Sequence, residues 1–383
     1  MKQNTSMQPV RRIAYVIPGL SVGGMERQLV QQLTVLARDE RYRYEIITLN
    51  TPVDTSSIRA TLPQSVTVTQ YSFKSGFGIQ LLRTLYTHFK TSTPDIVVSS
   101  AFMSNTAVRL LKHFFGYAVI AREHNVYPER TVLQRMLNTL LYWTATDVYV
   151  AVSQEAARAA EQAAWLPKGS VQVIENGIDI EAWEAKKVLS NSPHTEKEAL
   201  GIKKTDRVVL AVARFNSKKR LDLLIDAFEL FWKTHQSWHL VLVGFGEGET
   251  FLRAHAKKKR AQTHIHFVVG RYDVENLYAI ADVYTLVSLY EGFPNVLLEA
   301  LFFNVPIVAT EAPGVSAVVT DDRVGRIVGS DPEHIAAGIA EIALWSKRER
   351  KVFGERAFEH IRSFDIKTVS AAYRSLFDTL LRR

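Results

Sequence analysis

The sequence predicts an α/β protein with two domains, each built on a doubly wound parallel sheet. Short apolar runs such as 12–18 (RIAYVIP) and 207–213 (RVVLAVA) alternate with helical patterns along the chain. This alternation is typical of parallel strands joined by helices. The 383 residues exceed what one core normally holds, because domains average about 100–200 residues. Hydrophobic content of 47% and charged content of 22% are ordinary for a globular protein.

Composition and charge exclude several classes of protein. The net charge is +8, but the basic runs 218–220, 257–260 and 347–351 lack the interleaved aromatic residues of a nucleic-acid module. We therefore expect no nucleic-acid partner. The chain has no cysteine, which removes disulfides and thiolate metal sites and suits the cytoplasm. It also lacks a signal-peptide core and any run of about 18 apolar residues, so we expect no membrane-spanning segment.

The first strand leads into a glycine loop. Gly19 and the pair Gly23-Gly24 follow the run 12–18, and an amphipathic helix comes next. Glycine lets backbone amides approach an anion closely, so such a loop can hold phosphate. Many α/β domains open in this way, however. The pattern is not G-x-G-x-x-G and does not indicate a dinucleotide site.

Strand ends in the first half supply one more candidate. Apolar runs recur at 44–49, 67–71, 96–99, 118–122, 148–152 and 171–174, with helical patterns between most of them. Ligands of doubly wound sheets bind at the carboxyl ends of strands. His124 directly follows the run 118–122. From the residues alone, a single histidine at such a place is more often a structural hydrogen-bonding group than a catalyst.

Two cations follow the first strand of the second half. Arg214 and Lys219 lie five residues apart between the run 207–213 and a helical pattern over 221–232. The planar guanidinium and the mobile ammonium can both reach one diphosphate. A basic surface loop explains the spacing equally well.

Glycines and histidines further on point to no cofactor or metal. The segment 244–248 (GFGEG) resembles a dinucleotide fingerprint only loosely, and no acid follows about 20 residues later, so we reject a nicotinamide cofactor. His264 and His266 alternate along a strand and share one face. Without a third ligand nearby, a structural role is favoured over a metal site.

The stretch 284–309 contains the most distinctive pattern. It predicts a strand (285–288), an acidic Gly-Phe-Pro turn (291–294), a helix (295–303) and another strand (306–309). Pro294 is expected as the first helical residue. The helix N-terminus would then point free amides at the strand end. Glu291 and Glu299 flank that point, which suits a ligand with a central phosphate and hydroxyls on either side; a capping acid and a solvated glutamate are the structural alternative.

Glu291 and Glu299, inside S-x-x-E-G-F-P-N-x-x-L-E-A, resemble the E-x7-E signature of GT4-type retaining glycosyltransferases, which have the two-domain GT-B fold. The resemblance extends from about Arg12 to the C-terminal helix. It implies that Glu291 binds donor-sugar hydroxyls and that Glu299 binds the ribose of the nucleotide. The backbone around them would face the sugar and the diphosphate, through Gly292, Phe293, Pro294, Asn295 and Val296.

The same resemblance assigns the other candidates. Gly23 and Gly24 match a Gly-Gly-x-Glu loop over the donor phosphates, with Glu26 mainly structural. His124 would position the donor sugar, and Arg214 with Lys219 would neutralise the leaving diphosphate. Arg271 would border the base. Three positions depart from the family pattern: Arg220 and Asn304 stand where glycine is usual, and Ala317 stands where a glutamate is usual.

Domain limits follow from composition and from the resemblance. The polar stretch after residue 185 indicates a linker over 186–204. We therefore expect an N-terminal acceptor-binding domain over 1–185 and a nucleotide-sugar-binding domain over 205–365. The resemblance implies that a last helix, 366–383, packs back on the first domain.

The expected activity is transfer of a sugar, with retention, from a nucleotide-diphosphate donor, with UDP favoured, to a glycan or lipid-linked acceptor of bacterial surface polysaccharide or glycolipid synthesis. No metal or other cofactor is expected, since two cations do the neutralising. The helical segments 106–115 and 128–143 combine cations with large apolar residues, which suggests peripheral docking on an anionic membrane at its cytoplasmic face or, equally, core packing. A GT-B phosphorylase, a nucleotide-sugar epimerase and a non-catalytic nucleotide-sugar binder are the alternatives.

Overall fold

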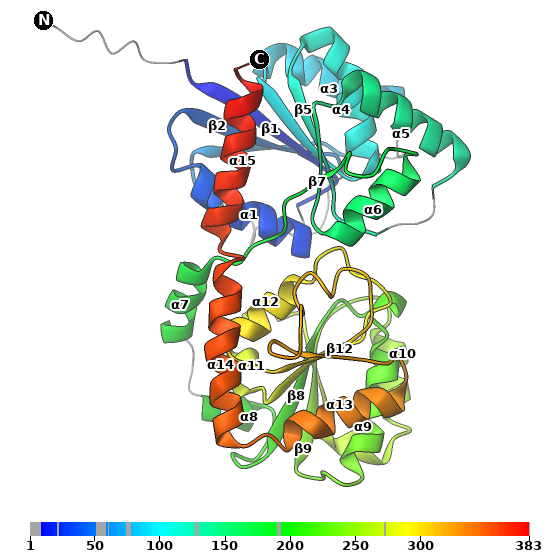
Figure 1. The fold of residues 1–383 in the computed structure, drawn as a ribbon, viewed down its shortest axis with the longest axis vertical. Helices are drawn as coiled ribbons and strands as arrows, with labels where there is room; N and C mark the ends of the chain where they lie inside the picture. The colour runs from blue at the N-terminus through cyan, green and yellow to red at the C-terminus, as the bar shows by residue number, and fades with distance from the viewer. Residues whose placement is uncertain are drawn as a thin grey trace, which may run out of the picture. The chain divides into compact units, whose positions relative to one another are not determined.

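The computed structural model describes residues 9–20, 23–50, 59, 61–73, 78–126, 130–189, 193–271 and 273–382. The chain forms two compact units. Residues 1–177 together with 366–383 make the first, and residues 178–365 make the second. Each is an α/β unit with a parallel sheet, as the alternation of strands and helices predicts (Figure 1).

The first unit has a seven-stranded parallel sheet in the order β3-β2-β1-β4-β5-β6-β7. Its strands are β1 (Arg11–Ile17), β2 (Tyr42–Thr48), β3 (Val66–Gln70), β4 (Ile96–Ser100), β5 (Ala118–Glu123), β6 (Val148–Ala151) and β7 (Gln172–Val173). Its helices include α1 (Gly24–Leu36), α3 (Ile79–Ser92), α4 (Phe102–Phe115), α5 (Val132–Ala145), α6 (Gln154–Ala163) and α15 (Ile366–Leu380).

Both faces of this sheet are buried, which explains its continuous apolar strands. Along β1, Ile13 and Tyr15 pack into a core shared with α1 and α15. The alternate residues Ala14 and Val16 pack into a second core with α3 and α4. Successive side chains of a strand point to opposite faces, so a strand covered on both sides must be apolar at every position.

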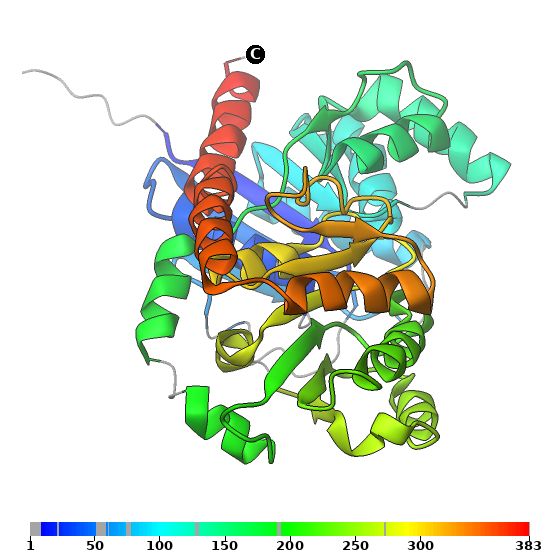
Figure 2. The ribbon, with the colours of Figure 1, turned by 60° about the horizontal axis from the view of Figure 1, so that its bottom comes forward.

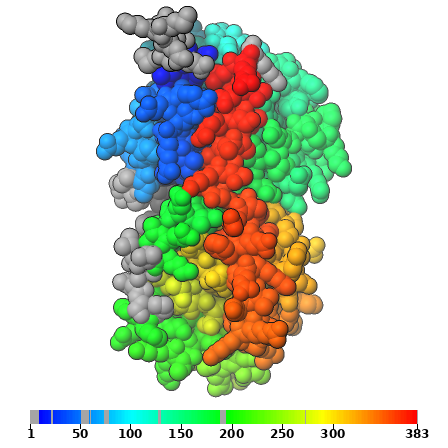
Figure 3. Space-filling model, turned by 60° about the vertical axis from the view of Figure 1, so that its left-hand side comes forward, coloured from blue at the N-terminus to red at the C-terminus, as the bar shows by residue number. Residues whose placement is uncertain are grey.

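The C-terminal helix belongs to the first unit. Buried residues of α15, among them Tyr373 and Phe377, share the core of β1 and β2. The Tyr42 ring meets Phe377 edge-on at 5.9 Å. Figures 1 and 3 show α15 on the surface of this unit, next to segments from the N-terminal part of the chain.

The second unit has a six-stranded parallel sheet in the order β10-β9-β8-β11-β12-β13. Its strands are β8 (Arg207–Val212), β9 (Trp238–Gly244), β10 (Ile265–Val269), β11 (Val283–Leu286), β12 (Ile307–Thr310) and β13 (Arg326–Val328). Its helices are α7 (Ile180–Leu189), α8 (Pro193–Ala199), α9 (Leu221–Trp232), α10 (Glu249–Ala256), α11 (Glu275–Ile280), α12 (Asn295–Phe302), α13 (Pro332–Ala343) and α14 (Lys347–Arg362), with 3-10 turns η1 (Ser217–Lys219) and η2 (Arg260–His264). Helices α9 and α13 pack together on one face, and Figure 2 shows α13 running beside β12 and β13.

The structure corrects the predicted linker over 186–204. Helix α7 begins at Ile180, α8 spans much of the rest, and both pack against α11. Trp183 is buried against the rings of Tyr278 and Phe303. The unit boundary therefore falls after Gly177 rather than after residue 185. Residues 190–192, which suggested the linker, lie outside the described part of the chain. Most of the described polar residues of α7 and α8 are exposed.

Within the ranges that the structure describes, no helix is long and apolar enough to cross a membrane.

Candidate donor site at the ends of β8 and β11

The candidate site lies where strand order reverses in the second sheet. From β8 the chain proceeds outward through β9 to β10, whereas from β11 it proceeds through β12 to β13 on the other side. The loops after β8 and β11 therefore stand at the carboxyl ends where the strand order reverses, the usual ligand position in such sheets. The Leu289 N–H donates to the carbonyl of Lys218 at 2.9 Å and ties the two loops together.

Lys219 and Glu291 meet at this point. Lys219 Nζ lies 2.5 Å from Glu291 Oε1, although the residues are 72 apart in sequence. The Ser288 hydroxyl donates to the same carboxylate oxygen at 2.6 Å. The side chains are only 24% and 12% exposed, so the pair is weakly screened by water. The structure thus joins two residues that the sequence analysis selected separately.

Glu299 is the second acid, on the helix that follows Glu291. It is 8% exposed, and the Tyr278 hydroxyl donates to its Oε2 at 2.8 Å. Both acids lie near the buried Tyr284. Burial raises the pKa of Tyr284 well above its ordinary value, and the negative charges of Glu299 and Glu291 raise it further. The two carboxylates therefore share one region of the unit.

The turn between the acids is held by close backbone contacts. The Glu291 N–H donates to the Pro313 carbonyl at 2.9 Å. Gly314 has φ +84°, and a Cβ there would overlap the Glu291 carbonyl and lie 2.8 Å from the Gly292 carbonyl. Glycine is required at this position for both reasons. Residues 313–317, which depart from the family pattern at Ala317, thus support the acidic turn.

Helix α12 begins at Asn295, as predicted, but Pro294 is not its first helical residue. Pro294 has φ −83° and ψ 87°, so it precedes the helix as its N-cap, and Asn295 is the first helical residue. The backbone amides at this N-terminus remain next to the acidic turn, with Val296 in the first turn. Phe293 packs against Phe364 at 5.8 Å, so its side chain stabilises the turn, and Gly292 lies next to Gly314.

Two departures from the family pattern have a backbone explanation. Arg220 has φ +45° and Asn304 has φ +57°, the left-handed region that glycine enters freely. Asn304 ends α12, and asparagine tolerates this conformation better than most residues. Arg220 is the N-cap of α9, and its side chain makes the same left-handed backbone conformation strained.

Arg214 belongs to the same loop as Lys219 but lies closer to β8. Its guanidinium is 5.9 Å from the centre of the Phe245 ring. The Phe215 N–H donates to the Phe245 carbonyl at 2.8 Å, and a Cβ on Gly246 would overlap the Phe215 carbonyl. The glycines of 244–248 therefore let the loops after β8 and β9 pack closely, which accounts for their resemblance to a nucleotide fingerprint.

Arg271 is held away from this group. Its guanidinium pairs with both oxygens of Glu196 and, at 3.1 Å, with Asp273. It follows β10, the edge strand, which lies two strands from β8, or about 10 Å at 4.8 Å per strand. The structure gives Arg271 a contact to α8 and does not bring it to the Lys219–Glu291 pair.

The remaining predicted residues lie at the carboxyl edge of the first sheet, whose order also reverses between β1 and β4. His124 follows β5, and its Nε2 lies 3.2 Å from the Ser100 hydroxyl at the end of β4. Burial and the positive charge of Arg122 hold the pKa of His124 well below its ordinary value, so the imidazole is neutral at pH 7. Gly23 is the N-cap of α1, Gly24 is its first residue, and the Glu26 carboxylate lies over Gly23.

Sequence reasoning missed the residues that position these groups. Tyr278 and Ser100 have no spacing signal, because each meets its partner through the fold, and Ser288, although it stands in the quoted S-x-x-E pattern, was given no role. Beside His124, Glu123 is buried and pairs with Arg130 at 2.6 Å, and the fully buried Arg109 donates to Asn138 at 2.6 Å.

His266 lies in β10, whereas His264 ends the turn η2 rather than standing on the strand as predicted, and a third histidine, His239, lies beside both. His239 Nδ1 lies 2.9 Å from His266 Nε2, and His239 Nε2 lies 3.2 Å from Asp206. The His264 ring is 4.6 Å from that of His239. Even so, among the residues with a described placement, no group of three or more His, Cys, Asp or Glu side chains is arranged to hold a metal ion.

Comparison with known proteins agrees with this architecture. Residues 22–182 match the family model "Glycosyltransferase Family 4", and residues 193–360 match "Glycosyl transferases group 1". An uncharacterized glycosyltransferase of Haemophilus influenzae is 34% identical over 115 residues, which are 30% of this chain and 33% of that protein. The N-acetyl-alpha-D-glucosaminyl L-malate synthase of Bacillus anthracis is 25% identical over 244 residues, 62% of this chain and 61% of that protein. Each alignment thus spans less than two thirds of the relative's length.

The crystal structure of HepE from Anabaena in complex with UDP superposes with a TM-score of 0.80 at 18% identity, covering 96% of this chain and 100% of that one. Two doubly wound units, each with a candidate site at its strand-order reversal, define the GT-B class of proteins. Within that class, the two matched domains show that the chain belongs to the family 4 group of glycosyltransferases.

Proposed function

We propose that the protein is a retaining glycosyltransferase that takes a sugar from a nucleotide-diphosphate donor, with UDP favoured. The observation that supports this most directly is the Lys219–Glu291 pair, which lies at the strand-order reversal beside the N-terminus of α12. A cation, a helix N-terminus and an acid at one position suit a diphosphate joined to a hydroxyl-rich sugar.

Each end of the donor has a partner in this proposal. Glu291 accepts hydrogen bonds from sugar hydroxyls, and Glu299, oriented by Tyr278, accepts them from the ribose. Lys219, Arg214 and the amide of Val296 hold the diphosphate, and the Asn295 amide, which donates to the Phe293 carbonyl at 3.1 Å, lies beside them. When the sugar–phosphate bond breaks, negative charge develops on the diphosphate, and these fixed donors stabilise it without reorganisation. His124, as a neutral imidazole, hydrogen-bonds the sugar and helps to orient it.

We also propose that transfer needs no divalent metal, because Lys219 and Arg214 supply the positive charge. Transfer should continue in excess EDTA at the untreated rate. Loss of activity in EDTA that is restored by added magnesium or manganese would contradict this part of the proposal.

The acceptor is proposed to be a glycan or a lipid-linked intermediate at an anionic membrane. Support comes from α5, where Leu133 is 74% and Trp143 66% exposed, with Met136 and Leu140 on the same side at 56% and 58%. Spacings of three and four residues put these side chains on one helix face, and an apolar face of this kind suits the lipid interface. Of the two segments predicted from sequence, α4 is largely core, since Val108 and Leu111 are buried.

Sedimentation with liposomes tests the membrane proposal. Replacing Leu133, Leu140 and Trp143 by glutamine should abolish cosedimentation with phosphatidylglycerol vesicles. Leu344→Gln is the matched control, because Leu344 is 80% exposed in the second unit. Equal sedimentation of the two variants would contradict α5 as the docking face.

The function itself is tested by ligand binding followed by turnover. A thermal-shift screen across nucleotide sugars should identify a donor, since a ligand at 100 times its Kd stabilises by about 2.7 kcal/mol. Incubation of that donor with extracted membrane lipids and glycans should then release the nucleoside diphosphate. Production of sugar 1-phosphate only when inorganic phosphate is added would indicate a phosphorylase, and binding without any turnover would indicate a non-catalytic binder.

A further inference from the structure

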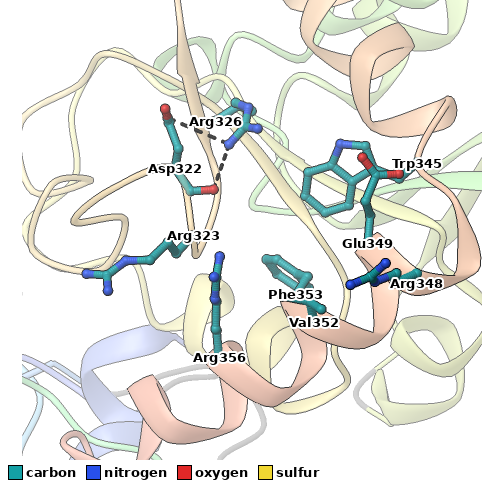
Figure 4. Close-up of a pocket in the computed structure, with 9 residues that line it drawn as sticks. All are labelled: Asp322, Arg323, Arg326, Trp345, Arg348, Glu349, Val352, Phe353 and Arg356. Carbon is teal, nitrogen blue, oxygen red and sulfur yellow. Dashed lines mark hydrogen bonds and ion pairs between the residues drawn. The ribbon is translucent and has the colours of Figure 1, made fainter.

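A pocket lies in the second unit, at the opposite end of the strands from the candidate donor site. Its volume is about 250 Å³. The loop that enters β13 forms one wall through Asp322, Arg323 and Arg326, and α14 with the residue pair before it forms the other (Figure 4). Arg326 is the first residue of β13, so the pocket is at the amino end of that strand, whereas Glu291 follows the carboxyl end of β11.

The floor of the pocket is apolar. Phe353 is 3% exposed, and the Trp345 ring lies 5.6 Å from it. Val352 lines the pocket next to Phe353. The Arg326 guanidinium lies 5.7 Å from the centre of the Trp345 ring and closes one side. A ligand can therefore bury one weakly polar face here.

Two of the four arginines that line the pocket are already neutralised. Arg323 pairs with Asp321, with its Nε 2.9 Å from Oδ2, and points away from the pocket in Figure 4. Arg326 pairs with Glu341 at 2.7 Å. Both therefore have carboxylate partners within the unit.

Arg348 and Arg356 have no ion-pair partner among the residues that the structure describes. They lie eight residues apart on α14, or about 12 Å along the helix axis, and in Figure 4 the Phe353 ring lies between their guanidinium groups. Arg348 also stands in the first turn of α14, where the helix dipole disfavours a cation. An anionic ligand would remove that penalty.

Two carboxylates restrict the kind of anionic ligand that the pocket can bind. Asp322 lines the pocket with one oxygen 3.7 Å from Arg326, and Glu349 caps α14 through Ser346 at 2.7 Å. Carboxylates repel a bare polyphosphate but accept hydrogen bonds from hydroxyl groups. An apolar floor, two separate cations and hydroxyl acceptors together fit a ring that carries both hydroxyls and anionic groups.

We propose that this pocket binds a sugar bearing two or more phosphate or carboxylate groups. The ring lies on Trp345 and Phe353, and the anionic groups are held by Arg348 and Arg356, since arginine pairs with phosphate and carboxylate in a planar, two-bond geometry. Such a sugar can come from two sources: a free sugar phosphate or an acidic residue of a glycan chain. The site is separate from the proposed donor site and does not depend on that proposal.

Calorimetric titration of the full chain tests the proposal. The probes are fructose 1,6-bisphosphate for a free sugar phosphate and trigalacturonate for an acidic glycan, with fructose and sodium phosphate at matched ionic strength as references. We expect saturable 1:1 binding of at least one probe and none of either reference. The probe that binds identifies the source.

The variant Arg348→Gln with Arg356→Gln should weaken that binding at least tenfold. Lys347→Gln with Lys351→Gln removes the same charge from exposed positions of the same helix that do not line the pocket, and it should bind as the unchanged protein does. Absence of saturable binding by both probes, or equal weakening in the two double variants, would overturn the proposal. Because the measurement is binding at α14 rather than transfer, its outcome does not depend on the donor site.

Discussion

Both sheets reverse their strand order near the middle, but the side chains at their carboxyl edges differ. In the second unit the reversal point has a charged pair, Lys219 with Glu291, and a buried acid, Glu299. In the first unit the edge has the backbone of Gly23, a neutral His124 hydrogen-bonded to Ser100, and a buried Glu123–Arg130 ion pair beside that histidine. The same fold therefore supplies one edge with a lysine–glutamate pair beside a helix N-terminus and one edge with a neutral imidazole. The difference lies in the loops that follow the strands, because the central strands β4 and β11 are buried along their whole length in both sheets.

If the charged edge does the neutralising, loss of its cation should have the largest effect. Lys219→Ala should lower the transfer rate by about 10²–10³, the usual effect of removing one preorganised donor to developing negative charge. Steady-state kinetics measure this, with circular dichroism to show that the variant is folded. Lys218→Ala removes the same charge one residue away and should retain most activity; equal losses in both would show that only the overall charge of the loop matters.

The buried acid should affect donor binding next. Glu299→Gln should weaken UDP binding by roughly ten- to hundredfold, because hydrogen bonds to a charged group contribute about 1.5–3 kcal/mol. Titration of UDP and of its 2′,3′-dideoxy analogue separates the cause. The dideoxy analogue should bind equally to both proteins, and an equal loss for both ligands would remove Glu299 from the ribose.

Disturbing the backbone contacts that support the acidic turn should lower the free energy of unfolding. Gly314→Ala combines a positive φ with a clash against the Glu291 and Gly292 carbonyls, so we expect about 2–4 kcal/mol of destabilisation from the two effects together. Gly116→Ala is a control in the first unit, with φ +73° and nothing within 4 Å of the added Cβ. It should cost only about 1–2 kcal/mol. Urea unfolding measures the destabilisation by both variants. Equal destabilisation would mean that the acidic turn moves to accommodate the added Cβ without a loss of stability.

At the carboxyl edge of the first sheet, we expect a substitution beside His124 to have a smaller catalytic effect. Ser100→Ala removes one hydrogen bond to His124, which contributes about 0.5–1.5 kcal/mol, so transfer should fall by no more than about tenfold. The pH dependence of the rate between 6 and 8 should stay unchanged, because the imidazole is already neutral. A loss as large as that of Lys219→Ala would end the distinction between the edges.

The histidine cluster of the second unit predicts a pH dependence of stability. Burial, with the charges of His239 and His264, lowers the pKa of His266 to about 4. Since the unfolded imidazole titrates near 6.5, unfolded chains bind more protons between these values, and stability should fall as the pH drops from 6.5 toward 4. Asp206 and Lys197 lie on the His239 side of the cluster. Thermal unfolding of His266→Asn should show a shallower decline; an identical decline would assign the effect to other groups.

Sequence reasoning predicted the strands and the acidic turn because both have local signals. Continuous apolar runs identify buried strands, and Gly-Phe-Pro between two acids identifies a turn before a helix. It failed at the linker, where polar residues belong to the exposed faces of α7 and α8. The contacts of Tyr278 with Glu299 and of Ser288 with Glu291 were not predicted, since nothing in the spacing of 21 or three residues specifies a hydrogen bond. Arg271 is a different case. The family resemblance assigned it to the nucleotide base, and in the structure its guanidinium pairs with Glu196 of α8.

A crystal structure with UDP bound tests the central claim most directly. We expect the diphosphate to lie within hydrogen-bonding distance of Lys219 Nζ and the first amides of α12, with a ribose hydroxyl on Glu299. UDP bound elsewhere, with the Lys219–Glu291 pair unchanged and no contact to Glu299, would contradict it.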